Sequence, residues 1–284
     1  MILVTSASGN AGRHIVRALV EQGHDVRATD LNPRVEELAS LGVKDVMVAD
    51  LNRLSDIRRI LDGVDKVVFI SPPFVASEYY IGKYVIDESV KAGIKQFIFH
   101  SVAHPCISAL LHHDSKRRIE EHLMHRGSSD DLNFTILQPP SYMYNFFSGL
   151  DLKAEKYSSY YAVESRLSFV APQDIAEVVA KIIREEKKHK EATYEVSSAD
   201  YLSVNDLVSV YNEATGSSIY GEHVDVDLFL EIYNLQDVYA RAGFTAMSEL
   251  YSQYGLRSNS NVLEWLLGRP PTTFKQFVEQ RARG

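Results

Sequence analysis

The segment between His112 and Leu123 holds the side chains whose types and spacing most suggest chemistry. On a helix, His112, Lys116, Ile119 and Leu123 would lie along one stripe. The two apolar members should be buried against neighbouring elements, which would turn His112 and Lys116 inward as well. Because lysine ordinarily extends to water, the alternative is a plain helix start capped by the polar residues between them.

An inward His112 is a candidate general base. A nearby ammonium disfavours the imidazolium form, so the ring would stay neutral and could accept a proton. Three further imidazoles, His100, His104 and His113, are close in the sequence. Their irregular spacing, on a strand end and a helix start, matches no familiar metal pattern, and we predict no metal site.

A second candidate site follows the first apolar run of the chain. A strand, a tight turn of small residues and a helix would point free backbone N–H groups and a helix dipole at a pyrophosphate. Gly9 would allow close backbone approach and Gly12 close packing of helix on strand, whereas Ser6 replaces the first glycine of the usual pattern. An ordinary strand-to-helix turn is the alternative. The residues predicted to hold the phosphates are Thr5, Ser6, Ser8, Gly9, Asn10, Ala11 and Gly12.

Asp30 is predicted to choose the dinucleotide. It ends the second apolar run, 18 residues after Gly12, where a carboxylate can accept both ribose hydroxyls of an adenosine. A 2'-phosphate would meet like-charge repulsion there, which Arg34 could partly offset. We therefore expect NAD(H) in preference to NADP(H). The alternative is that Asp30 only caps the following Asn32-Pro33 turn.

Other strand ends supply the remaining candidates. Asp50 and Leu51 are predicted to lie beside the adenine, with a solvated turn residue as the alternative for Asp50. Ser101 and Tyr142 are candidates to assist His112 in proton transfer. Lys116 is predicted to bond the nicotinamide ribose. Further cofactor contacts are predicted at Ser71, Pro72 and Pro139.

An aromatic cluster follows the last of these strands. Tyr142, Tyr144, Phe146 and Phe147 could wall an apolar substrate pocket. Aromatic residues at this density also form ordinary core, and both interpretations stay open.

The elements that position these residues alternate between two periods. Short apolar runs separated by helical patterns, several of which end at glycine, predict βαβ units and a doubly wound, Rossmann-like parallel sheet. Ligands bind beyond the carboxyl ends of such strands. The predicted strands are Ile2–Thr5, Asp25–Asp30, Asp45–Ala49, Lys66–Ile70, Gln96–His100 and Asn133–Gln138.

The alternation becomes irregular beyond about residue 150. We predict a dinucleotide-binding domain over residues 1–150 and a smaller, mostly helical substrate-binding lobe over 151–284. Residues 166–197 are expected to return to the core sheet. Asp174 is expected to cap the helix that follows Pro172 and Gln173.

Composition excludes several classes. The chain has 284 residues and a formal charge of -8, which disfavours direct binding to a phosphate backbone. No apolar run is long enough to cross a membrane. The single cysteine, Cys106, excludes an internal disulfide and fits a reducing compartment. The start at Ile2-Leu3-Val4 lacks the features of a secretory leader, so we expect a cytoplasmic protein.

Several motifs together resemble the NmrA-like family of the atypical short-chain dehydrogenase/reductase superfamily. The resemblance runs the whole length of the chain. The motifs that carry it are Val4–Arg13, Ser101–Pro105, His112–Glu121, Thr135–Pro139, Phe169–Ala171 with Asp174–Ala176, and Leu267–Pro270.

The resemblance carries expectations about chemistry. In the wider superfamily a tyrosine four residues before a lysine protonates a carbonyl. His112 stands at that tyrosine's place here, and Lys116 keeps the lysine. Some family members with this departure are dinucleotide sensors and transcriptional co-regulators, and others are reductases or tailoring enzymes of natural products.

We therefore expect an enzyme, an NAD(P)H-dependent reductase or a tailoring enzyme of secondary metabolism. Its substrate would be a small apolar carbonyl, imine or quinone compound held between the sheet edge and the C-terminal lobe. One alternative is a non-catalytic redox sensor with a protein partner. Another is an acid–base cyclase or isomerase that uses the dinucleotide only as a scaffold.

Overall fold

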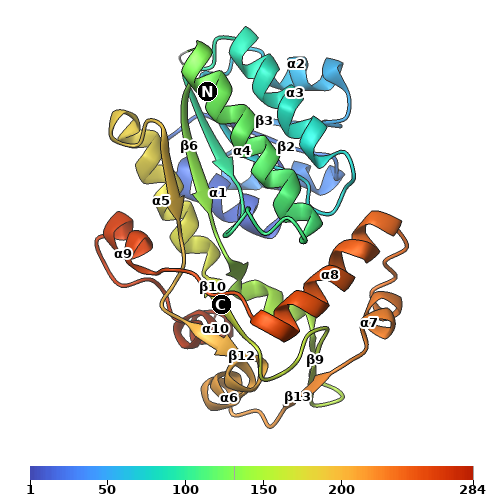
Figure 1. Cartoon of the computed structure of the whole chain (residues 1–284). Helices are drawn as coiled ribbons and strands as arrows, with labels where there is room; N and C mark the ends of the chain where they lie inside the picture. The colour runs from blue at the N-terminus through green and yellow to red at the C-terminus, as the bar shows by residue number, and fades with distance from the viewer. Residues whose placement is uncertain (131, 284) are drawn as a thin grey trace. The chain divides into compact units, whose positions relative to one another are not determined.

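A seven-stranded sheet forms the core of the computed structural model, which describes residues 1–130 and 132–283. The strand order is β11-β6-β5-β4-β1-β2-β3 (Figure 1), and the pairings from β6 across to β3 are parallel. The predicted doubly wound α/β fold is confirmed. The strands are β1 (Ile2–Val4), β2 (Val26–Asp30), β3 (Asp45–Val48), β4 (Lys66–Ile70), β5 (Gln96–His100), β6 (Asn133–Gln138) and β11 (Ala192–Glu195).

The strand order reverses beside β1. The chain builds β2 and β3 on one side of β1 and then returns to place β4, β5 and β6 on the other side. The loops that follow β1 and β4 diverge at such a point and leave a crevice beyond the strand ends. The fold therefore brings the turn after Thr5, the carboxylate of Asp30 and the hydroxyl of Ser71 to one edge of the sheet.

Helices cover both faces of this sheet. On one face, α2 (Leu54–Leu61), α3 (Glu78–Lys91) and α4 (Leu111–Asp130) pack their apolar residues onto alternate strand residues in one buried cluster. The other face is covered by α1 (Asn10–Glu21) and α5 (Pro172–Arg184) (Figure 1). Left-handed glycines end the stretches before β2, β3, β4 and β5, as the sequence predicts: Gly23, Gly42, Gly63 and Gly93.

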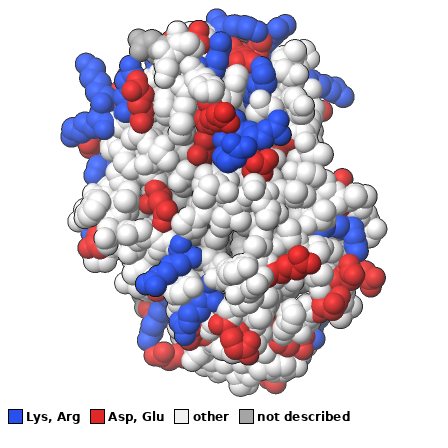
Figure 2. Space-filling model, viewed as in Figure 1, with Lys and Arg blue, Asp and Glu red and all other residues white. Residues whose placement is uncertain are grey.

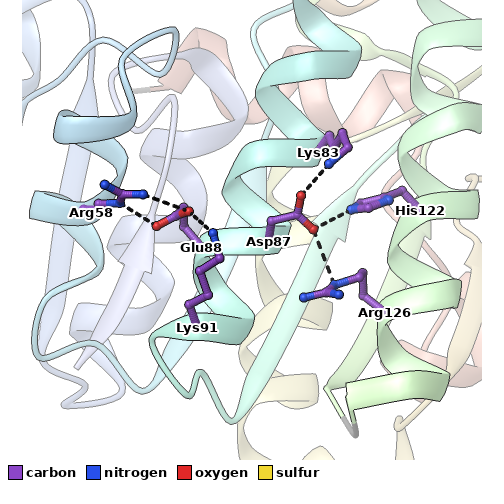
Figure 3. A network of polar contacts seen from close by, with 7 residues as sticks. All are labelled: Arg58, Lys83, Asp87, Glu88, Lys91, His122 and Arg126. Carbon is purple, nitrogen blue, oxygen red and sulfur yellow. Dashed lines mark hydrogen bonds and ion pairs between the residues drawn. The ribbon is translucent and has the colours of Figure 1, made fainter.

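Charged side chains tie α3 to the helices beside it (Figure 3). Glu88 accepts from Arg58 of α2 at 2.7 Å and from Lys91 at 2.6 Å. Asp87 accepts from Lys83 at 2.6 Å and lies 2.9 Å from the ring of His122 on α4. The cost of burying Glu88 is offset by these partners, which hold its pKa at about 2.

The chain divides into two compact units. The first comprises residues 1–107, 112–138 and 175–194, and the second comprises 108–111, 139–174 and 195–284. The transition therefore falls after Gln138, where β6 ends, rather than near residue 150. The segment that rejoins the first unit is α5 with β11, shorter than the predicted 166–197, because strand β10 pairs with β7 and β12 of the second unit.

The second unit contains two three-stranded sheets, with strand orders β12-β10-β7 and β13-β9-β8. Its strands are β7 (Ser141–Tyr142), β8 (Leu150–Asp151), β9 (Lys156–Ser159), β10 (Arg166–Val170), β12 (Tyr201–Ser203) and β13 (Tyr220–His223). Its helices are α6 (Val204–Thr215), α7 (Val226–Ile232), α8 (Val238–Tyr254), α9 (Asn261–Leu267) and α10 (Phe274–Arg283), with a 3-10 turn at η2 (Met143–Ser148).

Two of the family motifs meet inside the second unit. Asp174 is wholly buried and accepts from Arg269 at 2.8 Å and from the backbone and hydroxyl of Thr272 at 2.7 and 2.9 Å. The prediction that Asp174 caps the helix is wrong. The helix begins at Pro172, whose fixed φ suits a first turn, and Asp174 instead fastens the C-terminal segment.

Figure 2 shows Lys and Arg side chains beside Asp and Glu side chains in several groups, with broad areas of other residues between these groups. Within residues 1–130 and 132–283, no helix is long and apolar enough to cross a membrane.

Candidate functional site

The turn after β1 is held by side chains that precede α1. The hydroxyls of Thr5 and Ser6 both donate to the carbonyl of Ile70 at 2.9 Å, which ties the turn to the end of β4. Ser6 adopts a φ of 47°, a left-handed conformation for which glycine is the usual residue. A Cβ on Gly12 would lie 2.8 Å from Cα of Ala7, so only glycine lets α1 pack this closely on the turn.

Asp30 fixes the same turn from the end of β2. One carboxylate oxygen accepts from the backbone N–H of Ser8 at 3.1 Å and from its hydroxyl at 2.7 Å. The other accepts from the backbone of Asn32 at 3.2 Å, as expected of a turn cap. Asp30 therefore organises the turn and also caps the following one, which agrees with the turn-cap alternative, and its contact with an adenosine ribose stays a prediction.

A pocket opens beside Asp30. It brings together five residues predicted to contact the cofactor, Ser6, Asp30, Asp50, Leu51 and Pro72. Its other lining residues are Thr29, Leu31, Ala49, Asn52, Val75 and Ile81. A lining that mixes two carboxylates, Asp30 and Asp50, with apolar side chains suits an adenosine, whose ribose is polar and whose base is flat and weakly polar.

Arg34 lies at the start of the 3-10 segment η1 (Pro33–Leu41), and its side chain is exposed. Its guanidinium lies 3.6 Å from the carboxylate of Glu37, and Arg13 binds the same carboxylate at 2.7 Å. The single charge of Glu37 therefore offsets one of the two positive charges that Arg13 and Arg34 carry.

Lys116 is buried, as the stripe on α4 predicts. Its ammonium forms an ion pair with Glu78, in the first turn of α3. Glu78 is wholly buried and also accepts from the hydroxyl of Ser71 at 2.7 Å. Ser71, at the end of β4, is thus linked to Lys116 through this carboxylate.

His112 is buried one turn before Lys116. Its ring packs against Phe74, with 4.7 Å between centroids, and against His113, with 4.4 Å between centroids. Burial lowers the pKa of His112 well below its ordinary value, and the neighbouring His113 and Lys116 lower it further. His112 is therefore a neutral imidazole at physiological pH.

Two more imidazoles share this character. Burial lowers the pKa of His113 to about 4, against the hydrogen bond that its Nδ1 makes to the carbonyl of His104 at 3.1 Å. Burial, helped by the charge of Lys116, lowers the pKa of His100 to about 4. Among the described residues, no group of three or more His, Cys, Asp or Glu is placed to hold a metal ion.

Ser101 meets a partner that the sequence interpretation missed. Its hydroxyl donates to Glu120 of α4 at 2.5 Å, and the amide of Gln138 donates to both carboxylate oxygens of Glu120 at 2.9 and 3.0 Å. Burial raises the pKa of Glu120, although the hydrogen bonds from Ser101 and Gln138 oppose the rise. Glu120 lies four residues after Lys116, so it continues the inward line of polar residues on α4.

Tyr142 and Pro139 belong to the second unit, whereas the other predicted site residues belong to the first. Tyr142 is buried and stacks on Tyr144, with 4.9 Å between centroids. Burial raises the pKa of Tyr142 well above its ordinary value, so it is a poor proton donor. Phe146 stacks on Tyr157 at 4.7 Å between centroids and belongs to the core of that unit.

Comparison with known proteins identifies the family. The model of the NmrA-like family matches residues 1–279. The chain belongs to the NmrA-like family. This confirms the resemblance carried by the sequence motifs.

Relatives of this NmrA-like chain include named oxidoreductases. It is 24% identical over 286 residues to Quinone oxidoreductase 2 of Escherichia coli (strain K12), which covers 98% of this chain and 97% of the relative. The crystal structure of NADPH-dependent quinone oxidoreductase QOR2 from Escherichia coli, complexed with NADPH, matches with a TM-score of 0.80 at 23% identity, covering 99% of this chain and 100% of the other.

A regulator shares the same fold. Nmra, a negative transcriptional regulator solved in complex with NAD, matches this NmrA-like chain with a TM-score of 0.78 at 16% identity, covering 98% of this chain and 94% of the other. Structural likeness at these identities establishes the fold and leaves the chemistry to the site itself.

Proposed function

We propose that this NmrA-like protein is an NAD(P)H-dependent reductase or tailoring enzyme acting on a small apolar carbonyl, imine or quinone compound. The observation that carries the proposal is the buried Lys116 on α4, one turn after a neutral His112, in the unit that also holds the Asp30 pocket. The quinone oxidoreductase among the relatives supports the same reaction class.

The residues present fit a nicotinamide dinucleotide. The pocket beside Asp30 would take the adenosine, and the turn from Thr5 to Gly12 would hold the pyrophosphate at the positive end of α1. Lys116 would bond the ribose next to the nicotinamide, and Ser71 is linked to Lys116 through Glu78. Pro72 and Pro139 stay predicted cofactor contacts. When bound, the reduced dinucleotide supplies a hydride.

We further propose that NAD(H) is preferred to NADP(H). A 2'-phosphate on the adenosine ribose would approach the carboxylate of Asp30, which repels it. Arg13 and Arg34 could offset this repulsion, but each of them forms an ion pair with the carboxylate of Glu37. The local balance of charge therefore gives a phosphate little net attraction.

The proton for a reduced carbonyl would come from groups on this chain. Neutral His112 can donate a hydrogen bond to a developing oxyanion, but its low pKa makes it a weak source of protons. Ser101 donates to Glu120 in the structure, so to protonate the substrate its hydroxyl would turn to the substrate oxygen, release its proton there and take a replacement proton from protonated Glu120, whose pKa burial raises. His112 would then orient and stabilise, and Ser101 would donate.

Purified protein tests the proposal directly. Reduced dinucleotide mixed with a panel of quinones, ketones and imines should show cofactor oxidation at 340 nm, a wavelength at which only the reduced form absorbs strongly. His112→Ala should abolish turnover and leave dinucleotide affinity within about twofold. Unchanged turnover in that variant would remove His112 from the mechanism.

A second candidate is a redox sensor that passes its state to a protein partner. This candidate is favoured because neither His112 nor Tyr142 is a good general acid. Burial lowers the pKa of His112, so its ring carries no extra proton to give, and burial raises the pKa of Tyr142, so its hydroxyl holds its proton tightly. Silence across the substrate panel, together with calorimetric affinities that differ at least tenfold between oxidised and reduced dinucleotide, would select the sensor. Turnover with any panel member would reject it.

A further inference from the structure

Glu78 is an unusual residue for the position it occupies. It lies in the first turn of α3, yet its side chain is wholly buried. One carboxylate oxygen binds both the hydroxyl of Ser71 and the ammonium of Lys116. Among the described residues, the other oxygen has no hydrogen-bond partner. A glutamate that served only the helix dipole could do so from the surface, at no cost in desolvation.

The surroundings of Lys116 explain what the carboxylate does. The titratable groups that act on or respond to its charge come from three elements: His100 on β5, His112 and His113 on α4, and Glu78 on α3. The three imidazoles are neutral because burial lowers the pKa of each. Glu78 is therefore the counter-ion of the buried ammonium of Lys116.

We propose that Glu78 is a positioning residue that holds the ammonium of Lys116 and aims it at the dinucleotide. This rests on the proposed function, in which Lys116 bonds the nicotinamide ribose. Ser71 orients the carboxylate from the end of β4, and Glu78 orients the lysine. Neither motif spacing nor the family pattern at His112 and Lys116 assigns this role to residue 78.

Glu78→Gln tests the proposal, because the amide keeps the size of the side chain and removes its charge. The matched control is Glu88→Gln, a second low-exposure glutamate on α3 whose partners, Arg58 and Lys91, lie elsewhere (Figure 3). We expect Glu78→Gln to weaken dinucleotide binding by roughly tenfold, as for the loss of one charge-assisted hydrogen bond, and Glu88→Gln to leave it unchanged.

A second readout follows Lys116 without any dinucleotide. An amine held in an ion pair with a carboxylate reacts slowly with acetic anhydride, so mass spectrometry of the labelled protein reports how firmly Lys116 is held. In Glu78→Gln, acetylation of Lys116 at pH 8 should rise at least fivefold relative to Lys66, a lysine on β4 that is paired with Glu186. Glu78→Asp, which keeps the charge, should return both readouts toward wild type. A merely structural role predicts no such rescue.

The outcomes separate the two proposals. Dinucleotide affinity within twofold of wild type and unchanged acetylation of Lys116 would overturn the role of Glu78. If the wild-type protein binds neither NAD(H) nor NADP(H), the proposed function fails, and the acetylation ratio still decides whether Glu78 holds Lys116. If Glu78→Gln does not fold, the neutral pair Glu78→Gln with Lys116→Gln should restore folding, because no unpaired charge is left buried. Continued failure of that double variant would contradict the proposal.

Discussion

The hydroxyl of Ser101 donates a 2.5 Å hydrogen bond to Glu120, across the gap between the end of β5 and helix α4. Burial raises the pKa of Glu120. The folded chain therefore keeps the proton of the Glu120 carboxyl at pH values where the unfolded chain, in which this pKa is 4.5, has lost it. The contribution of this proton to the unfolding free energy is full below about pH 4.5 and is lost as the pH rises through the pKa of the folded state.

The first prediction follows from this sign. The side chain in Glu120→Gln has no charge at any pH. The unfolding free energy of this variant should therefore increase relative to that of wild type as the pH rises from 4.5 to 8. Urea unfolding at several pH values measures the difference. Glu121→Gln, at an exposed neighbouring position, should run parallel to wild type. Parallel curves for Glu120→Gln would show that Glu120 is ionised throughout.

The buried imidazoles predict sensitivity to acid. Burial lowers the pKa of His100 and of His113 from 6.5 to about 4. As the pH falls, the unfolded chain therefore protonates these two imidazoles before the folded chain does. Stability should be full above about pH 6.5 and fall toward pH 4, by on the order of 1 kcal/mol per pH unit for each imidazole. His113→Asn should flatten this fall, and His125→Asn, at an exposed position on the same helix, should not. Equal slopes in all three proteins would contradict the burial of His113.

The turn after β1 predicts a contrast between two glycines. In Gly12→Ala the new Cβ would meet backbone atoms of Ser6 and Ala7, which cannot move aside. We expect a loss of about 1–3 kcal/mol of unfolding free energy together with a loss of dinucleotide binding. In Gly9→Ala the nearest atom is the carbonyl oxygen of Ser6 at 3.2 Å, so a shift of a few tenths of an ångström suffices. Equal effects of the two substitutions in urea unfolding and calorimetry would show that the helix is not packed on the turn.

Dinucleotide choice should respond to Asp30. Asp30→Asn keeps an oxygen that can accept from Ser8 but removes the charge that faces a 2'-phosphate. The ratio of the NADP(H) to the NAD(H) dissociation constant should fall about tenfold, a change of 1.4 kcal/mol. Asp25→Asn, which removes an exposed carboxylate paired with Lys44, serves as the control. A ratio that is the same in both variants would place the adenosine ribose away from Asp30.

The sequence predicts the sheet well because its strands are short apolar runs bounded by glycine. All six strands expected in the first part of the chain occur, with ends that differ by at most one residue. The boundary between the units could not be read in the same way. It depends on the strands with which β10 pairs, β7 and β12, and neither is adjacent to β10 in the sequence.

The site was only partly predictable, for a physical reason. His112 and Lys116 are evident because their spacing on a helix is unusual for buried residues. Glu78 gives no such signal, since a glutamate in the first turn of a helix is ordinary on any protein surface. Glu120 could have been predicted, because it continues the four-residue spacing of His112 and Lys116. The predicted stripe continues through Ile119 instead and does not include Glu120.

The first unit closes on a stretch of chain that ends at Tyr194. A ribosome must therefore synthesise the chain through Glu195, the last residue of β11, before β11 can cover the edge of β6. Until then, the nascent chain presents an unpaired strand edge and lacks α5, whose apolar side chains cover one face of the sheet. Synthesis of this protein thus passes through a long interval in which a holding chaperone would have an obvious target.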